Sequence, residues 1–321
     1  MIDIVGKRGW YFLISALIIL PGLISLIVPP GWASWESGLN PGIDFTSGSV
    51  LQVSFAADVT EQHVHERMVQ LGHSEALIQK TGSNTFFIRT KLLKEPVGDL
   101  PSEREVVERD LEEFLALERD KVKFDSVSPI IAGETVINAF YAILAASVFI
   151  LLYIWYAFRR VPKSYRYGVA AILALVHDVV IVIGIFSILG KVLDIEVNSM
   201  FIVGVLIVAG YSVNDTIVVF DRIRENFRST RRGLAEGIVN ISINQMLGRT
   251  IITSLTTLFV VLSLLLLGGE AVRGFSIALI VGVFIGTYSS IYTASSTALA
   301  LDVSPEDLLP PQKGELVDDL P

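Results

Sequence analysis

Apolar residues are concentrated in six long blocks, which polar segments separate. The blocks run approximately over residues 9–28, 136–158, 167–189, 197–220, 251–267 and 275–299. Most are close to the twenty or so residues with which a helix crosses about 30 Å of hydrocarbon. Lys7 and Arg8 precede the first block, as in a cleaved signal peptide, but the block is longer than a typical signal core and a proline-rich turn follows it. The pattern therefore predicts six transmembrane helices, of which the first is retained.

The polar segment at 29–134 contains no further spanning block and shows the shorter periods of an α+β domain. Its alternation predicts strands at 49–55, 76–80, 85–91 and 122–131. The second and third strands flank Gly82-Ser83-Asn84, which is typical of a hairpin turn. Helices are predicted at 60–71 and 102–117. The resulting order, β-α-β-β-α-β, is the split βαβ arrangement of ferredoxin-like domains.

Capping residues support both helices of this domain. Thr60 or Asp58 would cap the first helix, and Ser102 with Glu105 would form a capping box at the second. The fold class is therefore a polytopic α-helical membrane protein, with six transmembrane helices and an α+β ferredoxin-like extracytoplasmic domain between helices 1 and 2. Its four parts would be the N-terminus with helix 1 (1–28), the extracytoplasmic domain (29–134), a five-helix bundle (135–300) and a disordered, acidic cytoplasmic tail (301–321).

Composition narrows the chemistry that this chain can perform. Hydrophobic residues make up 52% of the chain and charged residues 18%, and the net charge of -8 argues against nucleic-acid binding. The chain has no cysteine, which excludes disulfides, thiol nucleophiles and thiolate metal sites. His63, His65 and His73 lie in the polar segment, where we interpret them as a solvated helix face and not as zinc ligands. No cofactor is predicted.

Basic residues in the short loops predict the orientation in the membrane. The loop after helix 2 carries Arg159, Arg160, Lys163 and Arg166 without an acidic residue, and the loop after helix 4 is rich in arginine. The loops near 191–196 and 270 are not basic. Because cytoplasmic loops carry an excess of lysine and arginine, both termini are expected in the cytoplasm and the 29–134 domain outside.

A carboxylate and a guanidinium are predicted inside the membrane on successive helices. Asp215, preceded by Asn214, lies within helix 4, and Arg249 begins helix 5. Arg249, Thr253 and the threonines at 256 and 257 fall on one helix face. The two helices should be antiparallel, so Asp215 and Arg249 reach comparable depths. They would form either a proton-coupling pair or a static ion pair that holds two helices together, since intramembrane charges usually have a partner and a function.

A second polar pair, His177-Asp178, is predicted near the middle of helix 3. Burial disfavours the charged form of each group, and each could help to keep the other charged. The pair would be either a proton relay or a structural hydrogen bond that faces the bundle. On helix 6, Ala278, Gly282, Gly286 and Ser290 recur every four residues, which predicts a close packing face.

Enzyme chemistry is not indicated by this sequence. It contains neither a G-x-S-x-G nucleophile elbow nor an H-E-x-x-H zinc motif. Asp178 and Asp215 could be imagined as an intramembrane aspartyl protease dyad, but Asp178 lacks the tyrosine, and Asp215 the glycine-rich context, that such proteases share. The chain is therefore predicted not to be an enzyme.

The residues around Asp215 closely resemble the signature of the SecF family, the smaller membrane subunits of bacterial SecD–SecF protein-export complexes. The resemblance is carried by the segment 208–226 and by four others, at 42–45, 174–181, 249–257 and 274–292. It covers nearly the whole chain. One departure is visible, since the family tends to have paired glycines after Asp44-Phe45 and this chain has Thr46-Ser47-Gly48-Ser49.

This resemblance implies a transport subunit related to the resistance-nodulation-division exporters. Such a subunit would pair with SecD in the membrane lipid to form a twelve-helix unit in the cell inner membrane. The unit would assist the SecYEG translocon and SecA in exporting unfolded preproteins with the proton-motive force. By motif, Asp215 would be the carboxylate of proton passage, with Arg249 and Thr253 as its partners on the next helix.

Two other classes of function remain open at this point. The first is a stand-alone proton-coupled exporter of lipids or small molecules from the same superfamily, which would also need twelve helices. The second is an assembly protein without transport activity, in which the intramembrane charges are only structural.

Overall fold

The computed structural model describes residues 1–27, 38–96, 101–158, 165–229, 235–269 and 272–301. The predicted acidic tail lies outside the described residues. Contacts divide the chain into two compact units, Pro41–Phe140 and the combination of Met1–Asn40 with Tyr141–Pro321. We call the first the outer domain and the second the helix bundle, and we describe each by itself.

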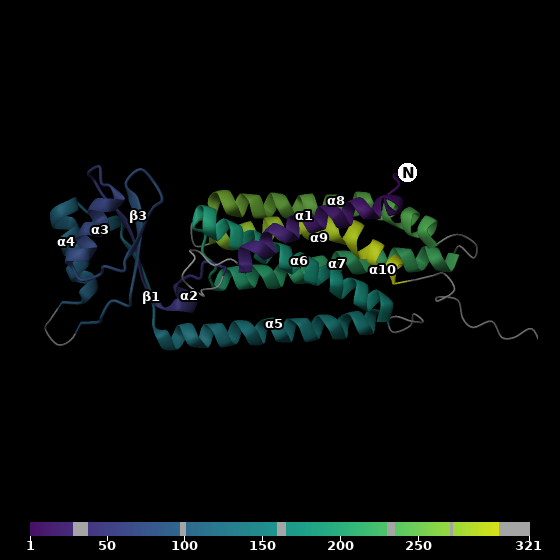
Figure 1. Ribbon diagram of the computed structural model, residues 1–321, viewed down its shortest axis with the longest axis horizontal. Helices are drawn as coiled ribbons and strands as arrows, with labels where there is room; N and C mark the ends of the chain where they lie inside the picture. The colour runs from purple at the N-terminus through teal and green to yellow at the C-terminus, as the bar shows by residue number, and fades with distance from the viewer. Residues whose placement is uncertain (28–37, 97–100, 159–164, 230–234, 270–271, 302–321) are drawn as a thin grey trace, which may run out of the picture. The chain divides into compact units, whose positions relative to one another are not determined.

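Among the residues that the structure describes, six helices are long and apolar enough to cross a membrane, which confirms the predicted number. They are α1 (Arg8–Ile27), α5 (Pro129–Phe158), α6 (Tyr165–Leu193), α7 (Ser199–Ser229), α8 (Ala235–Leu267) and a last span. The last span begins as α9 (Arg273–Tyr288), passes through a π-helix, η4 (Ser289–Ala294), and ends as α10 (Ser295–Ala300). These helices run side by side in Figure 1, and a short 3₁₀ turn, η1 (Val5–Lys7), precedes α1.

Several helices are longer than the apolar blocks predict. α7 extends to Ser229 and not to 220, and α8 begins at Ala235, well before the predicted start at 251. The apolar blocks mark only the part of each helix that suits hydrocarbon, whereas backbone hydrogen bonding continues into the polar turns beyond it. Asp215 and Arg249 therefore lie deep within their helices, each roughly four turns from the α7–α8 connection.

Small residues let the helices of the bundle approach closely, as the spacing on helix 6 predicts. A Cβ atom added to Gly282 would lie 2.0 Å from a methyl group of Val208, and one added to Gly286 would lie 3.2 Å from Cβ of Ser212. The helices α1 and α6 also approach closely, because a Cβ atom added to Gly22 would lie 2.8 Å from Cα of Gly184. The polar groups of α6, α7 and α9 are therefore held within hydrogen-bonding reach of one another.

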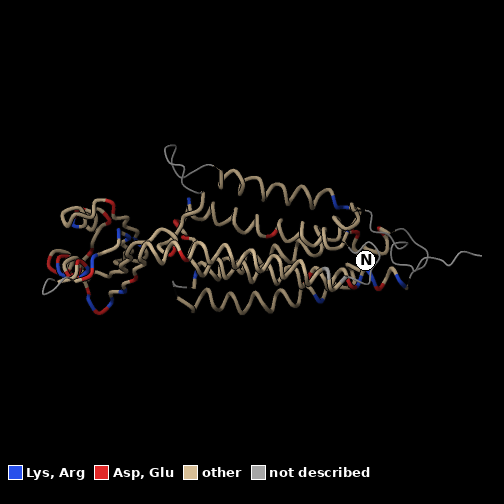
Figure 2. Tube along the Cα trace, turned by 90° about the horizontal axis from the view of Figure 1, so that it is seen from below, with Lys and Arg blue, Asp and Glu red and all other residues tan. Residues whose placement is uncertain are grey.

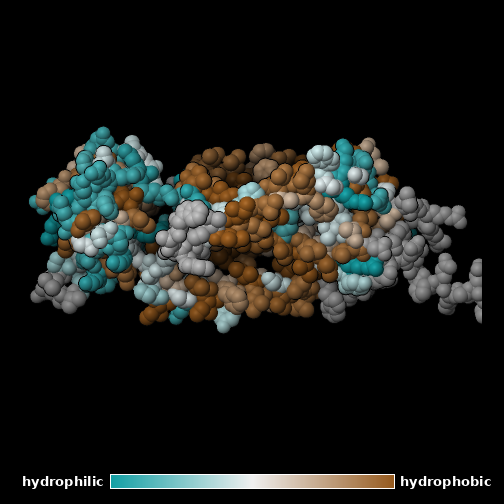
Figure 3. Space-filling model, in the orientation of Figure 1, coloured by the Kyte–Doolittle hydropathy of each residue, from teal (hydrophilic) through white to brown (hydrophobic). Residues whose placement is uncertain are grey.

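The surface of the bundle is suited to lipid. Its visible face is largely hydrophobic in Figure 3, and charged residues gather toward the ends of its helices in Figure 2. Large apolar side chains such as Phe149, Phe259 and Val260 are exposed on it. Hydrocarbon, and not water, is the solvent in which such a surface is stable.

The outer domain is a four-stranded sheet with two helices on one face. β1 (Gly48–Ser54), β2 (Leu77–Lys80), β3 (Thr85–Thr90) and β4 (Lys123–Val127) pair in the order β2-β3-β1-β4, with every pair antiparallel. α3 (Glu61–Gln70) and α4 (Glu103–Leu115) pack on the apolar face, and the short helices α2 (Ile43–Thr46) and η2 (Arg119–Lys121) complete the unit. This is the predicted ferredoxin-like order.

The caps and one strand end test the prediction in detail. The side chain of Thr60 accepts a hydrogen bond from the backbone of His63, and Ser102 with Glu105 forms the predicted capping box. The predicted last strand at 122–131 is wrong at its end, because β4 stops at Val127 and α5 begins at Pro129. Proline is favoured in the first turn of a helix and cannot donate to a sheet, so this boundary could have been predicted.

The backbone is strained where the sequence departs from the paired glycines. Ser47 has φ 63° and ψ 170°, and Gly48 has φ 127°. The first conformation belongs to a region that is essentially restricted to glycine and costs a side chain about 1–3 kcal/mol. The outer domain therefore holds Ser47 and Gly48 in backbone conformations that suit glycine, although the first of them is a serine.

Candidate functional site

A buried carboxylate of α7 lies against α8. Asp215 is 9% exposed, and its Oδ1 accepts a hydrogen bond from Thr250 Oγ1 at 3.3 Å. Its Oδ2 has no hydrogen-bond partner among the described residues. Ser290 and Arg249 interact with the carboxylate at longer range, without a regular hydrogen bond or ion pair to it in the described part of the chain. An ionised carboxylate at this place is therefore poorly compensated, and burying one costs several kcal/mol.

α8 carries two polar stripes, and the predicted stripe does not face the core of this chain. Arg249 and Thr253 are exposed, and the hydroxyl of Thr253 donates to carbonyl groups of its own helix. The buried stripe consists of Thr250 and Ser254, which are 1% and 4% exposed. The α8 partner of Asp215 is therefore Thr250, one residue beyond the predicted Arg249. Asn214 is exposed as well.

The His177-Asp178 pair is buried in the bundle, between α1, α6, α7 and η4. Asp178 is 0% exposed, and its Oδ1 lies 2.8 Å from Nδ1 of His177. Its Oδ2 accepts hydrogen bonds from the hydroxyls of Ser212 and Ser289, the second at 2.6 Å. Nε2 of His177 lies 2.9 Å from Oγ of Ser15 on α1. In contrast to Asp215, this carboxylate has a donor for each of three lone pairs.

Consecutive serines of the π-helix reach the two carboxylate sites. Ser289 donates to Asp178, while Ser290 lies 3.2 Å from the hydroxyl of Thr216, the residue that follows Asp215. The sequence assigned Ser290 to a packing face and gave no role to Ser289. The pattern of hydroxyl residues at 289–290 was visible in the sequence, but the π-helix that aims them at different neighbours was not. Single-turn π-helices occur frequently at functional sites.

A hollow of about 410 Å³ opens beside Arg249. α7 lines it with Asp221, Arg222 and Glu225, and α8 with Met246 and Arg249. Arg249 therefore borders a polar, charged space and also interacts with Asp215 at longer range. Such a space can admit water to the region of the guanidinium.

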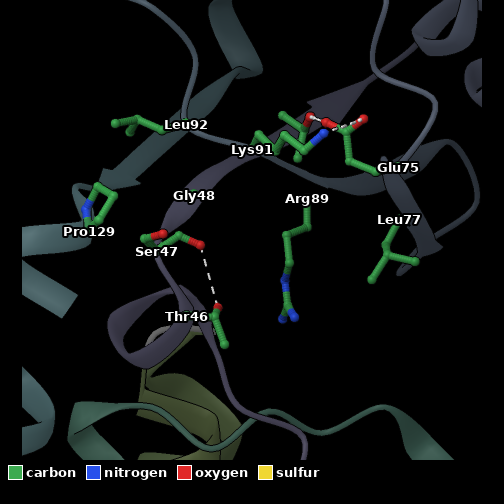
Figure 4. A pocket seen from close by; sticks show the side chains of 10 residues that line it. Thr46, Ser47, Gly48, Glu75, Leu77, Arg89, Lys91, Leu92 and Pro129 are labelled. Carbon is green, nitrogen blue, oxygen red and sulfur yellow. Dashed lines mark hydrogen bonds and ion pairs between the residues drawn. The ribbon is translucent and has the colours of Figure 1, made fainter. Parts of the chain in front are cut away.

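A second hollow, also of about 410 Å³, lies in the outer domain between the ends of β1 and β3 (Figure 4). Arg89 points into it, and burial lowers the pKa of this guanidinium. At its edge Lys91 lies 3.5 Å from Glu75. The pKa of Glu75 is held below its usual value, first by a hydrogen bond from its own backbone and then by Lys91.

Acidic and histidine side chains are the candidate metal ligands among the described residues. The residues that the structure describes include no cluster of three or more histidine or acidic side chains that could hold a metal ion. The polar groups around Asp178 and Asp215 are carboxyl, hydroxyl, imidazole and guanidinium groups, which together can bind, hold and exchange protons.

Comparison with known proteins agrees with the signature around Asp215. The family model for the C-terminal part of the protein export membrane proteins SecD and SecF matches residues 106–304, and the model for the SecD/SecF GG motif matches residues 32–59. The second match contains the strained Ser47-Gly48 turn.

Curated relatives and solved structures give the same result over most of the chain. The protein translocase subunit SecF of Thermobaculum terrenum is 40% identical over 92% of both chains, and that of Vibrio alginolyticus is 36% identical over 99% of this chain and 97% of its own. The crystal structure of SecDF, a translocon-associated membrane protein from Thermus thermophilus, matches 94% of this chain with a TM-score of 0.76 and 34% identity. This chain spans only 38% of that longer one.

A structure of SecDF in a super-membrane-facing form matches the same share of this chain with a TM-score of 0.60. Together with the six spans, the antiparallel outer sheet and the buried polar residues of α6 to α9, these matches lead to one assignment. The chain is a multi-pass membrane protein and belongs to the SecF family of protein translocase subunits.

Proposed function

We propose that this chain is the proton-motive-force-driven SecF subunit that works with SecD, SecYEG and SecA to export unfolded preproteins. In this proposal it lies in the cell inner membrane with both termini in the cytoplasm. The observation that carries the proposal is Asp215, a buried carboxylate that has, among the described residues, one neutral donor and one oxygen without a hydrogen-bond partner.

The surroundings of Asp215 support a proton-binding role. A neutral carboxylic acid can remain in this place with the hydrogen bond to Thr250, whereas the ionised form needs a further positive partner. Arg249 is the nearest candidate on α8 and already interacts with Asp215 at longer range. Loss of the proton would draw Arg249 toward Asp215, and gain of the proton would release it.

The membrane potential can bias this exchange. It supplies about 2.3 kcal/mol per charge at 100 mV. About 5.5 kcal/mol moves a two-state equilibrium from 1:99 to 99:1. Complete switching therefore needs a few tenths of a volt or the movement of more than one charge across the membrane. A smaller potential would still shift the equilibrium tens-fold. The moving element would be α7 with α8, and their movement would be passed to the outer domain, which holds the emerging preprotein.

The exposed stripe of α8 supports the pairing with SecD. Arg249 and Thr253 of α8, with Asn214 of α7, are exposed polar residues in a bundle whose visible face is largely hydrophobic (Figure 3). Exposed polar residues within a membrane span usually face a partner helix or a water-filled path. A SecD subunit on this face would enclose Arg249 and complete the path to Asp215.

The first test is Asp215→Asn, reconstituted with SecD and the translocon, with proton-driven export measured at fixed SecA activity. We expect loss of the proton-driven component and an unchanged SecA-driven component. Glu236→Gln is the matched control, because Glu236 is an exposed carboxylate of α8 that does not line the hollow beside Arg249. Export at the wild-type rate in Asp215→Asn would refute the proposal.

The second test is Arg249→Met, which is expected to assemble normally and lose coupling. Arg228→Met, at an exposed position of α7, is its control. If Arg249→Met only lowers the amount of assembled complex, the arginine is structural.

Co-purification separates this proposal from the alternatives. SecD and translocon components should accompany the chain if it is an export subunit, and a stand-alone exporter would purify without them. A scaffold without transport activity would support export equally well after the proton gradient is collapsed.

A further inference from the structure

The two buried carboxylates of the bundle end on neighbouring residues of one short element. Asp178 accepts from Ser289, and Ser290 contacts Thr216 beside Asp215. Ser212 and Thr216 lie one turn apart on α7, so the two sites also share a helix face. Among the described residues, the charged or titratable neighbour of Asp178 is His177, and that of Asp215 is Arg249, which acts on it only at longer range.

A single carbonyl connects the two serines. The oxygen of Gly286 accepts from the hydroxyl of Ser290 at 2.7 Å and lies 3.3 Å from that of Ser289. It also accepts a backbone hydrogen bond from Ser289 at the start of the π-helix. A carbonyl oxygen has two lone pairs and a serine hydroxyl has one proton, so these donors compete for one acceptor.

We propose that Ser289 and Ser290 couple proton binding at Asp178 to proton release at Asp215. Protonated Asp178 donates to Ser289, whose hydroxyl proton then rotates to the oxygen of Gly286. Ser290 gives up that acceptor and turns its proton toward Thr216 and Asp215, where a donor stabilises the ionised carboxylate. No proton passes through a serine, since each hydroxyl keeps its own proton and only rotates.

The coupling makes Asp178 a second proton-binding carboxylate of the proposed export cycle. It rests on the proposed function in one respect, that Asp215 exchanges protons. The two carboxylates take up protons in opposition. A proton on Asp178 releases a hydroxyl donor for ionised Asp215, so protonation of one carboxylate favours deprotonation of the other. In this way the bundle holds a single negative charge at either of two places, which is less costly than two buried charges.

The test is infrared difference spectroscopy of the SecD-containing complex during a pH titration. The carboxyl band of Asp215 is assigned by its loss in Asp215→Asn, and the band of Asp178 by its loss in Asp178→Asn. In the wild type, we expect the Asp178 band to shift as Asp215 titrates. If the Asp178 band is unchanged while Asp215 titrates, the proposal is wrong, and this comparison needs no serine variant.

Serine variants locate the coupling. Ser290→Ala is expected to abolish the shift of the Asp178 band while Asp215 still titrates, and Ser289→Ala to do the same. Ser276→Ala is the control, because Ser276 is a buried serine of α9 whose hydroxyl bonds only to the carbonyl of Val272 among the described residues. A shift that persists in both variants would assign the coupling to another route. Failure of Asp215→Asn to affect export would refute the proposed function without touching the spectral result.

Discussion

Substitution of Gly282 by alanine tests whether close contact of α7 and α9 holds the carboxylate sites together. The added Cβ would lie 2.0 Å and 2.6 Å from the two methyl groups of Val208 and 2.8 Å from its Cβ. Val208 is 1% exposed and β-branched, so rotation about χ1 cannot clear all three contacts. The helices must therefore separate in Gly282→Ala.

The cost can be set against the gain in helix propensity. Overpacking in a well-packed core costs about 1–3 kcal/mol, and a 2.0 Å contact belongs at the upper end of that range. Replacing glycine with alanine inside a helix returns about 1 kcal/mol. We expect Gly282→Ala to lower the free energy of unfolding by about 2 kcal/mol, which is roughly a thirty-fold change in the unfolding constant.

Gly210→Ala on α7 is the matched control, since an added Cβ there would meet nothing within 4 Å. It should be neutral or stabilise by up to about 1 kcal/mol. Both variants are measured by reversible unfolding in mixed micelles, with circular dichroism followed as the SDS fraction rises. The double variant Gly282→Ala with Val208→Ala should recover part of the loss, because two of the three clashing atoms are removed.

Equal stabilities for Gly282→Ala and Gly210→Ala would refute the reasoning, because the two substitutions differ only in what the new methyl group meets. No recovery in the double variant would show that Val208 is not the source of the cost. Infrared spectra of Gly282→Ala should also show a weakened bond between Asp178 and Ser212, since Ser212 faces the next glycine of the same stripe.

Three further predictions concern stability in the full chain. Ser47→Gly should stabilise the outer domain by about 1 kcal/mol and slow hydrogen exchange in β1. Gly48→Ala should have the opposite effect, because its Cβ would lie 2.7 Å from a backbone oxygen. Equal hydrogen exchange in the two variants would contradict the strain at this turn. Asn240→Leu should speed hydrogen exchange at the N-terminus at least ten-fold, because Asn240 accepts from two buried backbone N–H groups at 2.8 Å and 3.2 Å; protection as in the wild type would refute this. Arg67→Met should destabilise the outer domain by about 1–3 kcal/mol, because Arg67 and Asp110 form a half-buried bidentate ion pair. Unchanged hydrogen exchange in α3 and α4 would show that this ion pair contributes little to stability.

Elements governed by local chemistry could be predicted from the sequence. The six spans follow from hydrophobic length, and the caps at Thr60 and Ser102 follow from side chains that satisfy nearby backbone N–H groups. The strand order of the outer domain follows from its β-α-β-β-α-β sequence, because few arrangements of that order bury one face of a sheet. Helix ends were predicted less well, because polar turns outside the membrane carry no hydrophobic signal.

The partners of the buried polar groups could not be predicted in the same way. Arg249 and Thr250 are adjacent in sequence, and rotation of α8 by one residue, about 100°, decides which of them faces Asp215. The hydrophobic pattern of α8 does not determine that rotation, since its apolar residues surround the helix. The N-terminal contact with Asn240 also escaped prediction, because it joins residues that are far apart in the chain.

The exposed stripe of α8 has a physical cost in the membrane that a partner subunit would remove. A threonine that faces hydrocarbon satisfies its hydroxyl by donating to a carbonyl of its own helix, as Thr253 does at 3.1 Å, and its exposure therefore costs little. A guanidinium has five N–H donors and cannot satisfy them in this way. Arg249 lies roughly four turns from the α7–α8 connection and makes no ion pair within the described chain. It therefore needs hydrogen-bond acceptors or water from outside this chain. We infer that a SecD subunit supplies that environment, and that Arg249 can then move between it and Asp215 as the proton comes and goes.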